Sequence, residues 1–231
     1  MKHFVIIVAA GRGRRMNDDM PKQFLLLGNK PLLMHTIHNI YHFDKTQNII
    51  LVLHKDYLCL WNNLCKLYNF DVPLTIVEGG QERFYSVKNG LEIVEDNSLV
   101  AIHDGVRPFV SRSVWESCFD IAKHKGNAIP AIIPKDSIRI RIKIKKEENT
   151  RPISRSNTYL IQTPQCFHSS IIKEAYQQQY KEDYTDDIQV LEALNTTKVN
   201  IVEGNSKNIK ITDPLDMLIA EQILQQGQVV N

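Results

Sequence analysis

Continuous runs of apolar residues are spaced along the chain, and segments with helical spacing separate most of them. The runs, rich in Val, Ile and Leu, span residues 4–10, 49–53, 74–77, 99–103 and 128–133, with a shorter one at 199–202. Such runs are typical of parallel strands that are buried on both faces. The expected helices span residues 31–41, 57–68, 83–94 and 113–125. Because strands alternate with helices, the pattern predicts an α/β fold with a mostly parallel, doubly wound sheet.

Capping residues predict where several helices begin. Ser113 and Glu116 form a capping-box pattern, in which each side chain satisfies a free backbone N–H at the start of the fourth helix. Asp213 followed by Pro214 predicts the start of a last helix, with Asp as the cap and Pro in the first turn. The acidic pair 186–187 is similar to a catalytic dyad. Its place before an apolar segment favours a helix start instead.

Residues 138–145 alternate isoleucine with arginine or lysine, and this period of two predicts a one-sided antiparallel strand. We expect residues 137–157 to form a β-arm that projects from a single domain spanning 1–231. One face of the arm would carry Ile138, Ile140, Ile142 and Ile144. That face is too apolar for a lone arm in water, so we expect a second copy of the chain to cover it. The basic residues opposite would limit indiscriminate strand pairing.

The overall composition is that of an ordinary globular protein. The 231 residues are 43% hydrophobic and 23% charged, with a formal net charge of +2. This charge gives no reason to expect nucleic acid or membrane partners, and no apolar run approaches the ~20 residues of a membrane span. The four cysteines have no paired spacing, which disfavours a zinc site or a disulfide framework and favours a cytoplasmic protein.

A glycine-rich loop, Ala-Ala-Gly-Arg-Gly-Arg-Arg-Met over residues 9–16, follows the first predicted strand. Its backbone N–H groups would lie at the carboxyl edge of the sheet, where phosphates bind. The loop fits neither the dinucleotide fingerprint nor the Walker pattern. Three arginines, including Arg15, and the nearby Lys22 suit a triphosphate whose charge must be neutralised during transfer. The alternative is a solvated basic loop whose glycines only form a turn.

Two later segments also follow predicted strands. Gly79 and Gly80 would let the backbone approach a flat ligand, and Ser86 offers a hydroxyl, although a plain turn is the alternative. Asp104 ends the fourth strand, which is a suitable place for a carboxylate that holds Mg²⁺; a simple turn aspartate is the alternative. Lys210, between two isoleucines, points either into a cleft or to the surface.

The chain carries, in order, the motifs AAGRGRRM with PKQ, GGQERFYSV, HDGVRP, QTPQ, TDD and NIKITDP, which reach from residue 9 to residue 214. Taken together, these motifs resemble those of the 2-C-methyl-D-erythritol 4-phosphate cytidylyltransferase family of the non-mevalonate isoprenoid pathway. The resemblance implies a Rossmann-like nucleotidyltransferase fold, CTP and a polyol phosphate as substrates, and Mg²⁺. It also implies a homodimer in which each arm reaches the partner's active site.

The resemblance assigns roles to individual residues. Arg15, Lys22 and Lys210 are the expected catalytic residues, and Asp104 is the expected metal ligand. The expected nucleotide-binding residues are Ala9, Ala10, Gly11, Gly13, Gly79, Gly80, Ser86, Asp104 and Gly105. The expected residues for the polyol phosphate are Arg107, Thr163 and Lys210, with Ser137 and Arg155 supplied by the partner's arm.

The chain departs from the family pattern at three places, none of which removes a charged catalytic group. Ser137 replaces the usual Thr, Gly105 and Val106 replace a pair of alanines, and Gln81 replaces a frequent acidic residue. A close alternative is ribitol-5-phosphate cytidylyltransferase, which often carries Ala-Gly-Gly where this chain has Ala-Ala-Gly, whereas residues 153–157 favour the isoprenoid enzyme. A more distant alternative is a non-catalytic nucleotide- or nucleic-acid-binding protein, although the arm has no interleaved aromatics for base stacking.

Overall fold

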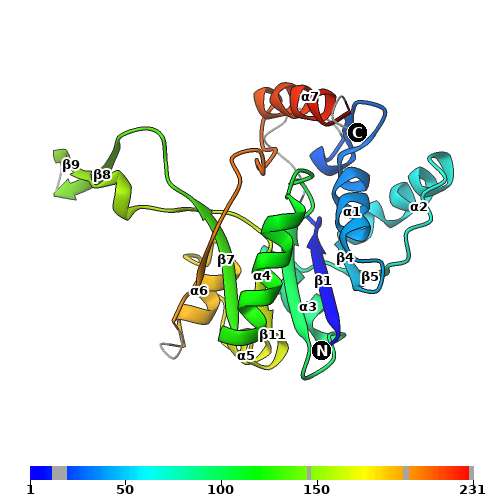
Figure 1. Cartoon of the computed structure of the whole chain (residues 1–231), viewed down its shortest axis with the longest axis horizontal. Coiled ribbons are helices and arrows are strands. Elements are labelled where there is room, and N and C mark those ends of the chain that lie inside the picture. Colours follow the sequence, from blue (N-terminus) through cyan, green and yellow to red (C-terminus); the bar gives the residue numbers. More distant parts are fainter. Residues whose placement is uncertain (12–19, 145–146, 195–197, 229–231) are drawn as a thin grey trace.

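The computed structural model describes residues 1–11, 20–144, 147–194 and 198–228. Within them, a central sheet of eight strands runs through the body of the protein (Figure 1). Across the sheet the strands are β5 (Thr75–Glu78), β4 (Asn48–Leu53), β1 (His3–Val8), β6 (Leu99–Asp104), β11 (Gln165–His168), β7 (Asn127–Ile132) and, both beside β7, β10 (Leu160–Ile161) and β12 (Ile201–Glu203).

The sheet is mostly parallel, as the apolar runs predict. β1 pairs in parallel with both β4 and β6, and β4 pairs in parallel with β5. The exceptions are β10, which pairs antiparallel with β7, and β11, which lies antiparallel between β6 and β7. The run of apolar residues in β11 is too short to predict it from the sequence. The fold class is therefore confirmed, with one antiparallel strand inserted in the middle of the sheet.

Helices cover both faces of the sheet. On one face are α1 (Leu32–Phe43), α2 (Leu58–Leu67) and α4 (Arg112–Lys125), and on the other are α3 (Arg83–Glu92), α5 (Ser169–Ala175) and α6 (Asp187–Glu192). Val5 and Ile7 of β1 belong to the first core, whereas Phe4 and Ile6 belong to the second. Alternate residues thus enter opposite cores, which explains why the strand is apolar without interruption.

A smaller third core joins the C-terminal helix α7 (Pro214–Gln228) to the hairpin of β2 (Leu26–Leu27) and β3 (Lys30–Pro31). It contains Leu27, Val106, Ile211 and Ala220. The backbone N–H of Ile211 also donates to the carbonyl of Val106 at 3.0 Å. These contacts bring the segment before α7 to the carboxyl end of β6. The remaining short elements are 3-10 turns at Lys22–Phe24, Lys55–Tyr57 and Arg155–Asn157.

The expected capping box of α4 is wrong. The helix begins at Arg112, and the hydroxyl of Ser111, not Ser113, accepts the backbone N–H of Val114. Arg112 donates to the carbonyls of His42 and Phe43 at the end of α1, which fixes the first turn earlier than expected. The carboxylate of Glu116 pairs with Arg112 at 3.4 Å and does not cap the helix.

The other two predicted helix starts are confirmed. Asp186 precedes α6, and its carboxylate accepts the backbone N–H of Gln189 at 3.1 Å. Asp213 precedes α7, and its carboxylate accepts the backbone N–H of Asp216 at 3.0 Å. The acidic pair 186–187 is therefore a helix start, as its position predicts.

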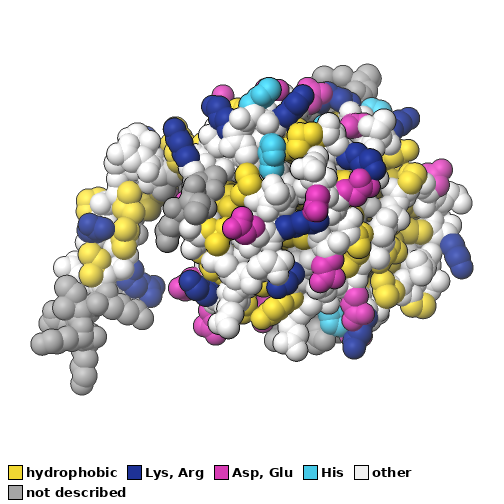
Figure 2. All heavy atoms as spheres, turned by 90° about the horizontal axis from the view of Figure 1, so that it is seen from below, with side chains coloured by type: hydrophobic (Ala, Val, Ile, Leu, Met, Phe, Trp, Pro, Cys, Tyr) yellow, Lys and Arg dark blue, Asp and Glu magenta, His cyan; other side chains and the backbone are white. Residues whose placement is uncertain are grey.

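The alternating segment forms a two-stranded antiparallel hairpin of β8 (Ile138–Ile144) and β9 (Glu147–Ile153). The hairpin stands away from the body (Figures 1 and 2). Ile140 on this hairpin is 36% exposed, and Figure 2 shows apolar side chains on the surface of the arm. None of the helices in the described part of the chain is long and apolar enough to cross a membrane.

A buried ion pair ties α3, α5 and α6 together beneath the sheet edge. Two nitrogens of the Arg83 guanidinium donate to the two carboxylate oxygens of Asp187, both at 2.7 Å. The hydroxyl of Tyr176, at the end of α5, donates to the same carboxylate at 2.6 Å. The side chain of Asp187 is fully buried, and burial together with the negative charge of Asp187 raises the pKa of Tyr176 well above its usual value. Both carboxylate oxygens of Asp187 thus have hydrogen-bond partners within the fold.

This network predicts unequal costs for two conservative substitutions. Tyr176→Phe removes one hydrogen bond and should lower the free energy of unfolding by about 1–3 kcal/mol. Asp187→Asn leaves the Arg83 charge without its partner and should cost more, about 3–5 kcal/mol. Urea denaturation followed by circular dichroism measures both values.

Asp96→Asn is the matched control, because Asp96 pairs with Lys173 at the surface and its side chain is 79% exposed. This variant should lose less than about 1 kcal/mol. If Asp187→Asn were no more costly than Asp96→Asn, the buried pair would not hold the three helices together.

Candidate functional site

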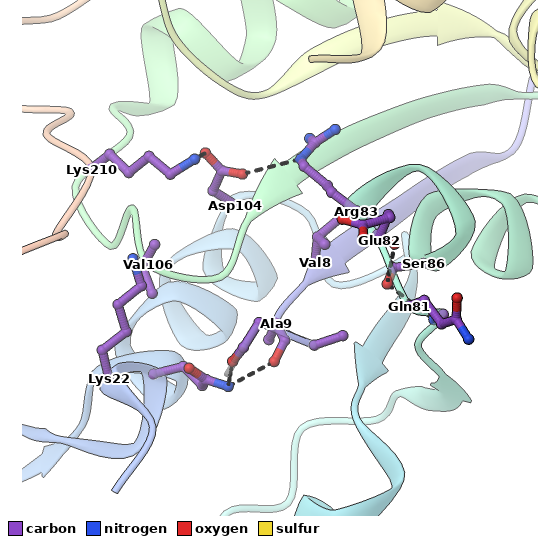
Figure 3. A pocket seen from close by; sticks show the side chains of 14 residues that line it. Val8, Ala9, Lys22, Gln81, Glu82, Arg83, Ser86, Asp104, Val106 and Lys210 are labelled. Carbon is purple, nitrogen blue, oxygen red and sulfur yellow. Dashed lines mark hydrogen bonds and ion pairs between the residues drawn. The ribbon is translucent and has the colours of Figure 1, made fainter. Parts of the chain in front are cut away.

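Two chambers open at the carboxyl edge of the sheet. The first chamber is lined by Val8, Ala9, Ala10, Gly11, Lys22, Gln23, Gly80, Gln81, Glu82, Arg83, Ser86, Asp104, Val106 and Lys210 (Figure 3). The second chamber is lined by Arg83, Asp104, Arg107, Ile161, Gln162, Thr163, Gln165, Thr185, Asp186, Gln189 and Lys210. Arg83, Asp104 and Lys210 line both, so the chambers meet at these three side chains. In open α/β sheets, ligands bind at this edge, where the strand order reverses on either side of β1.

The loops after β1 and β5 touch at the bottom of the first chamber. A Cβ on Gly79 would lie 2.3 Å from the Cβ of Ala10, so only glycine permits this approach. The hydroxyl of Ser86 accepts the backbone N–H of Gly80 and donates to the carbonyl of Glu82, both at 3.1 Å. The two loops therefore pack directly against each other, and the hydroxyl of Ser86 holds the loop after β5 in shape.

Gln23 fixes the first loop from below, a role that the sequence did not reveal. Its side chain is buried, and the amide nitrogen donates to the carbonyls of Ala9 at 2.8 Å and Gly11 at 3.0 Å. The neighbouring Lys22 lies in the same 3-10 turn and lines the first chamber. The only sequence signal for Gln23 is its place in the Pro-Lys-Gln motif.

The junction of the chambers is a buried carboxylate among three cations. The Asp104 carboxylate lies 3.1 Å from the Lys210 ammonium, 3.2 Å from the Arg107 guanidinium and 3.8 Å from that of Arg83. Figure 3 shows Lys210 and Arg83 reaching Asp104 from opposite sides. Burial alone would raise the pKa of Asp104, but the positive charges of Lys210, Arg83 and Arg107 hold that pKa well below its usual value. Asp104 is therefore ionised throughout the physiological range.

The structure gathers most of the expected site residues. Ala9, Ala10, Gly11, Gly80 and Ser86 line the first chamber, and Arg107 and Thr163 line the second. Gly105 packs beneath the loop after β1, since a Cβ there would lie 3.0 Å from that of Ala9.

Ser137 and Arg155, which the resemblance assigns to the partner's site, are exposed at the base of the arm and line neither chamber of their own chain. Gly13 and Arg15 lie outside the described residues.

Arg83 is the most important residue that the sequence reasoning left without a role. It stands in the GGQERFYSV motif, where the sequence indicates only the start of the helix expected over residues 83–94. In the structure it lines both chambers and pairs with Asp104 while its other nitrogens hold Asp187. Nothing local in the sequence indicates this, because the two carboxylates come from other elements.

The residues at the junction fit a magnesium site. Mg²⁺ is usually held by one or two carboxylates together with waters and the phosphates of a substrate. Asp104 supplies one ionised carboxylate at the carboxyl end of β6, and it lines the chamber that the glycine loop also lines. A single carboxylate of this kind suits an ion that takes its remaining ligands from waters and from the phosphates of a substrate.

The low pKa of Asp104 predicts a pH-dependent contribution to stability. Because the folded pKa lies below the unfolded value of about 3.9, the ionised group stabilises the fold above that pH. Asp104→Asn should lower the free energy of unfolding by about 3–5 kcal/mol at pH 7, since three cations lose their counter-charge. The difference from the wild type should shrink as the pH falls below about 4.

Urea denaturation between pH 7 and pH 3 measures this difference. Glu95→Gln is the control, because the Glu95 side chain is 57% exposed and pairs with Lys2 at the surface. A wild-type-to-variant difference that stayed constant across the pH range would contradict the low pKa.

Comparison with known proteins gives a consistent result. The family model described as 2-C-methyl-D-erythritol 4-phosphate cytidylyltransferase matches residues 3–226. The enzyme of that name from Phocaeicola vulgatus is 46% identical over 224 residues, covering 97% of this chain and all of the relative. The corresponding protein from Azobacteroides pseudotrichonymphae is 46% identical over 221 residues, covering 96% and 98%.

Solved structures agree with the sequence relatives. The 4-diphosphocytidyl-2C-methyl-D-erythritol synthase of Anaerococcus prevotii superposes with a TM-score of 0.82 at 30% identity, covering 97% of this chain and 98% of the other. The cytidylyltransferase of Thermus thermophilus gives a TM-score of 0.73 at 28% identity, covering 97% and 100%. With the family model spanning nearly the whole chain, this protein belongs to the 2-C-methyl-D-erythritol 4-phosphate cytidylyltransferase family.

Proposed function

We propose that this protein transfers the cytidylyl group of CTP to 2-C-methyl-D-erythritol 4-phosphate and releases pyrophosphate. The observation that carries the proposal is the pair of chambers that meet at Asp104, Arg83 and Lys210. The first chamber has the glycine loop and Lys22 for a nucleoside triphosphate, and the second has Arg107 and Thr163 for a polyol phosphate. Membership of the family supports the same pair of substrates.

The chemistry requires positive charge more than it requires a base. The attacking group is a phosphate monoester, which is mostly dianionic at neutral pH because its second pKa is about 6. Two anions must meet, and negative charge develops on the leaving pyrophosphate. We assign Lys22, Lys210 and Arg15 to the stabilisation of that charge.

The histidine buried behind the site is not suited to act as a general base. His103 is fully buried, and both of its ring nitrogens have partners within the protein at 3.0 Å. Its imidazole therefore has no ring nitrogen left to take a proton from a substrate. This agrees with a nucleophile that is already ionised.

We include Mg²⁺ in the proposal, held by Asp104 together with the phosphates of CTP. When bound, it would neutralise part of the triphosphate charge and orient the phosphate that is attacked. The role of the chain's own residues is to keep Asp104 ionised and to hold it at the junction, which Lys210, Arg107 and Arg83 support by their positive charge.

We further propose that the protein is a homodimer through the arm formed by residues 137–157. Ser137 and Arg155 lie at the base of the arm and line neither chamber of their own chain, which suits residues that serve the partner's second chamber. The exposed Ile140 supplies apolar surface for the contact. A cytoplasmic location fits the four free cysteines and the need for CTP.

Activity assays test the catalytic assignment. The wild type should release pyrophosphate from CTP with methylerythritol phosphate and Mg²⁺, and much more slowly with ribitol 5-phosphate. Lys22→Ala and Lys210→Ala should lower kcat about 10²- to 10³-fold, because each removes charge that is needed mainly in the transition state.

Lys207→Ala is the matched control, because Lys207 is an exposed lysine three residues before Lys210 and lines neither chamber. It should keep wild-type rates. Preference for ribitol 5-phosphate would assign the protein to the alternative activity, and release of pyrophosphate with neither alcohol would reject the proposal.

A charge placed on the arm tests the dimer. Ile140→Asp should shift the protein from dimer to monomer in sedimentation analysis and should lower activity, because Ser137 and Arg155 then cannot reach a partner. Ile93→Asp is the control, since Ile93 is also exposed, at 44%, but lies on the body of the protein. A fully active wild-type monomer would contradict the role of the arm.

A further inference from the structure

Two fully buried polar residues lie directly behind the second chamber. His103 and Asn208 are both 0% exposed, and neither is among the residues that line the two chambers. Each begins a motif whose later residues do line the site: His103 precedes Asp104, and Asn208 stands two positions before Lys210. Their burial away from any ligand raises the question of what their polar atoms hold.

His103 bridges two residues of the second chamber. Its Nε2 lies 3.0 Å from the backbone carbonyl of Arg107, and its Nδ1 lies 3.0 Å from the hydroxyl of Thr163. A carbonyl oxygen only accepts, so Nε2 carries a proton and donates it to Arg107. Thr163 is further fixed because its hydroxyl oxygen accepts the backbone N–H of Asp104 at 3.1 Å.

The tautomer of His103 follows from these contacts. The Thr163 hydroxyl oxygen already accepts the backbone N–H of Asp104, which leaves the hydroxyl proton for Nδ1 of His103. With the proton on Nε2, the neutral ring accepts at Nδ1 from the Thr163 hydroxyl.

Asn208 links the same two residues from the other side. The side-chain amide of Asn208 donates to the backbone carbonyl of Thr163 at 2.8 Å. The backbone carbonyl of Asn208 accepts from the guanidinium of Arg107, also at 2.8 Å. Gln162 also donates to the Asn208 carbonyl, at 3.2 Å. The contacts therefore close a ring that runs from His103 to Thr163, Asn208, Arg107 and back to His103.

The ring joins three parts of the chain that are distant in sequence. Arg107 follows β6, Thr163 precedes β11, and Asn208 belongs to the segment that carries Lys210 before α7. Hydrogen bonds to buried groups are costly to leave unmade, so each member constrains the others. Displacing a substrate-binding group by about 1 Å can reduce the rate about 100-fold, which makes such constraints matter for activity.

We propose that His103 and Asn208 are positioning residues, which set the geometry of Arg107 and Thr163 for the acceptor phosphate without touching either substrate. This inference rests on the proposed function, because it assigns the second chamber to the acceptor. Arg107 and Thr163 line the second chamber and not the first, so the ring acts on binding of the polyol phosphate and not on binding of CTP.

Three variants each open the ring at a different bond. His103→Gln places an amide near Nε2 and keeps a donor for Arg107, while it removes the acceptor for Thr163. His103→Asn places an oxygen near Nδ1 and keeps that acceptor, while it removes the donor. Asn208→Ser removes the donor to the Thr163 carbonyl and leaves the backbone contact with Arg107 in place.

The expected result is a separation of the two Michaelis constants. In each variant, KM for methylerythritol phosphate should rise about tenfold or more and kcat should fall, whereas KM for CTP should stay within about twofold of the wild type. The double variant His103→Gln with Asn208→Ser should cost less than the product of the single effects, because the ring is already open.

Asn127→Ser is the matched control. Asn127 is also fully buried, and its side chain donates to the carbonyl of Lys198 and accepts the N–H of Asn200, but it lies at the amino end of β7, opposite the site. It should lower the melting temperature and leave both Michaelis constants unchanged. Circular dichroism and thermal melts of all variants separate loss of folding from loss of positioning.

A spectroscopic measurement tests the ring without any substrate. A long-range ¹H–¹⁵N correlation spectrum of the wild type at pH 7 should show the His103 proton on Nε2, and the signals should shift in Asn208→Ser.

Changes in the two Michaelis constants by equal factors, or an unchanged KM for the polyol phosphate in folded variants of an active enzyme, would overturn the proposal. A wild type inactive with either alcohol would instead reject the proposed function.

Discussion

The site depends on the balance of charge around the carboxylate of Asp104. This group is nearly buried at the end of β6, where an isolated charge would be strongly unfavourable. Lys210, Arg107 and Arg83 surround it within 4 Å and keep it ionised. The dependence is mutual, because the three cations would repel one another without the carboxylate between them. In a cluster of this kind, the carboxylate keeps the cations close together when no phosphate group is bound, so that their positive charge is already in place for one.

The architecture delivers each of these charges from a different element. Arg83 begins α3 and is anchored by Asp187 at the start of α6, Arg107 follows β6, and Lys210 is carried past β6 by the third core under α7. The aromatic and aliphatic packing on both faces of the sheet therefore influences the site indirectly. The packing fixes where each helix and strand ends, and the position of these ends places the charged side chains.

Local patterns predicted the parts of this structure that local forces determine. Continuous apolar runs identified the parallel strands, because a strand buried on both faces such as β1 has no solvent-facing residues. Glycine-rich loops and strand-end residues such as Asp104 could be located for the same reason, since they follow those runs. The family motifs then indicated which of these residues share a site.

The remainder depends on contacts between distant segments. Arg83 and Asp187 are separated by 104 positions, and Thr163 and His103 by 60, so no window of sequence contains either pair. Strand β11 was missed because its four residues show no clear period, and its pairing with β6 and β7 is what places it. The cap of α4 lies two residues earlier than predicted, at Ser111 and not Ser113, because Arg112 bonds back to α1, and this tertiary contact outweighs the local capping pattern.

The meeting of the two chambers at only three of their lining residues has a consequence for divergence within such folds. The first chamber is built on the parallel strands β1, β5 and β6, whereas much of the second is built on the segment around β10 and β11 and on α6. With the chambers assigned as proposed, substitutions in that second group can reshape the pocket for a different alcohol while the nucleotide half stays intact. A fold organised in this way can exchange acceptors during evolution and retain one donor.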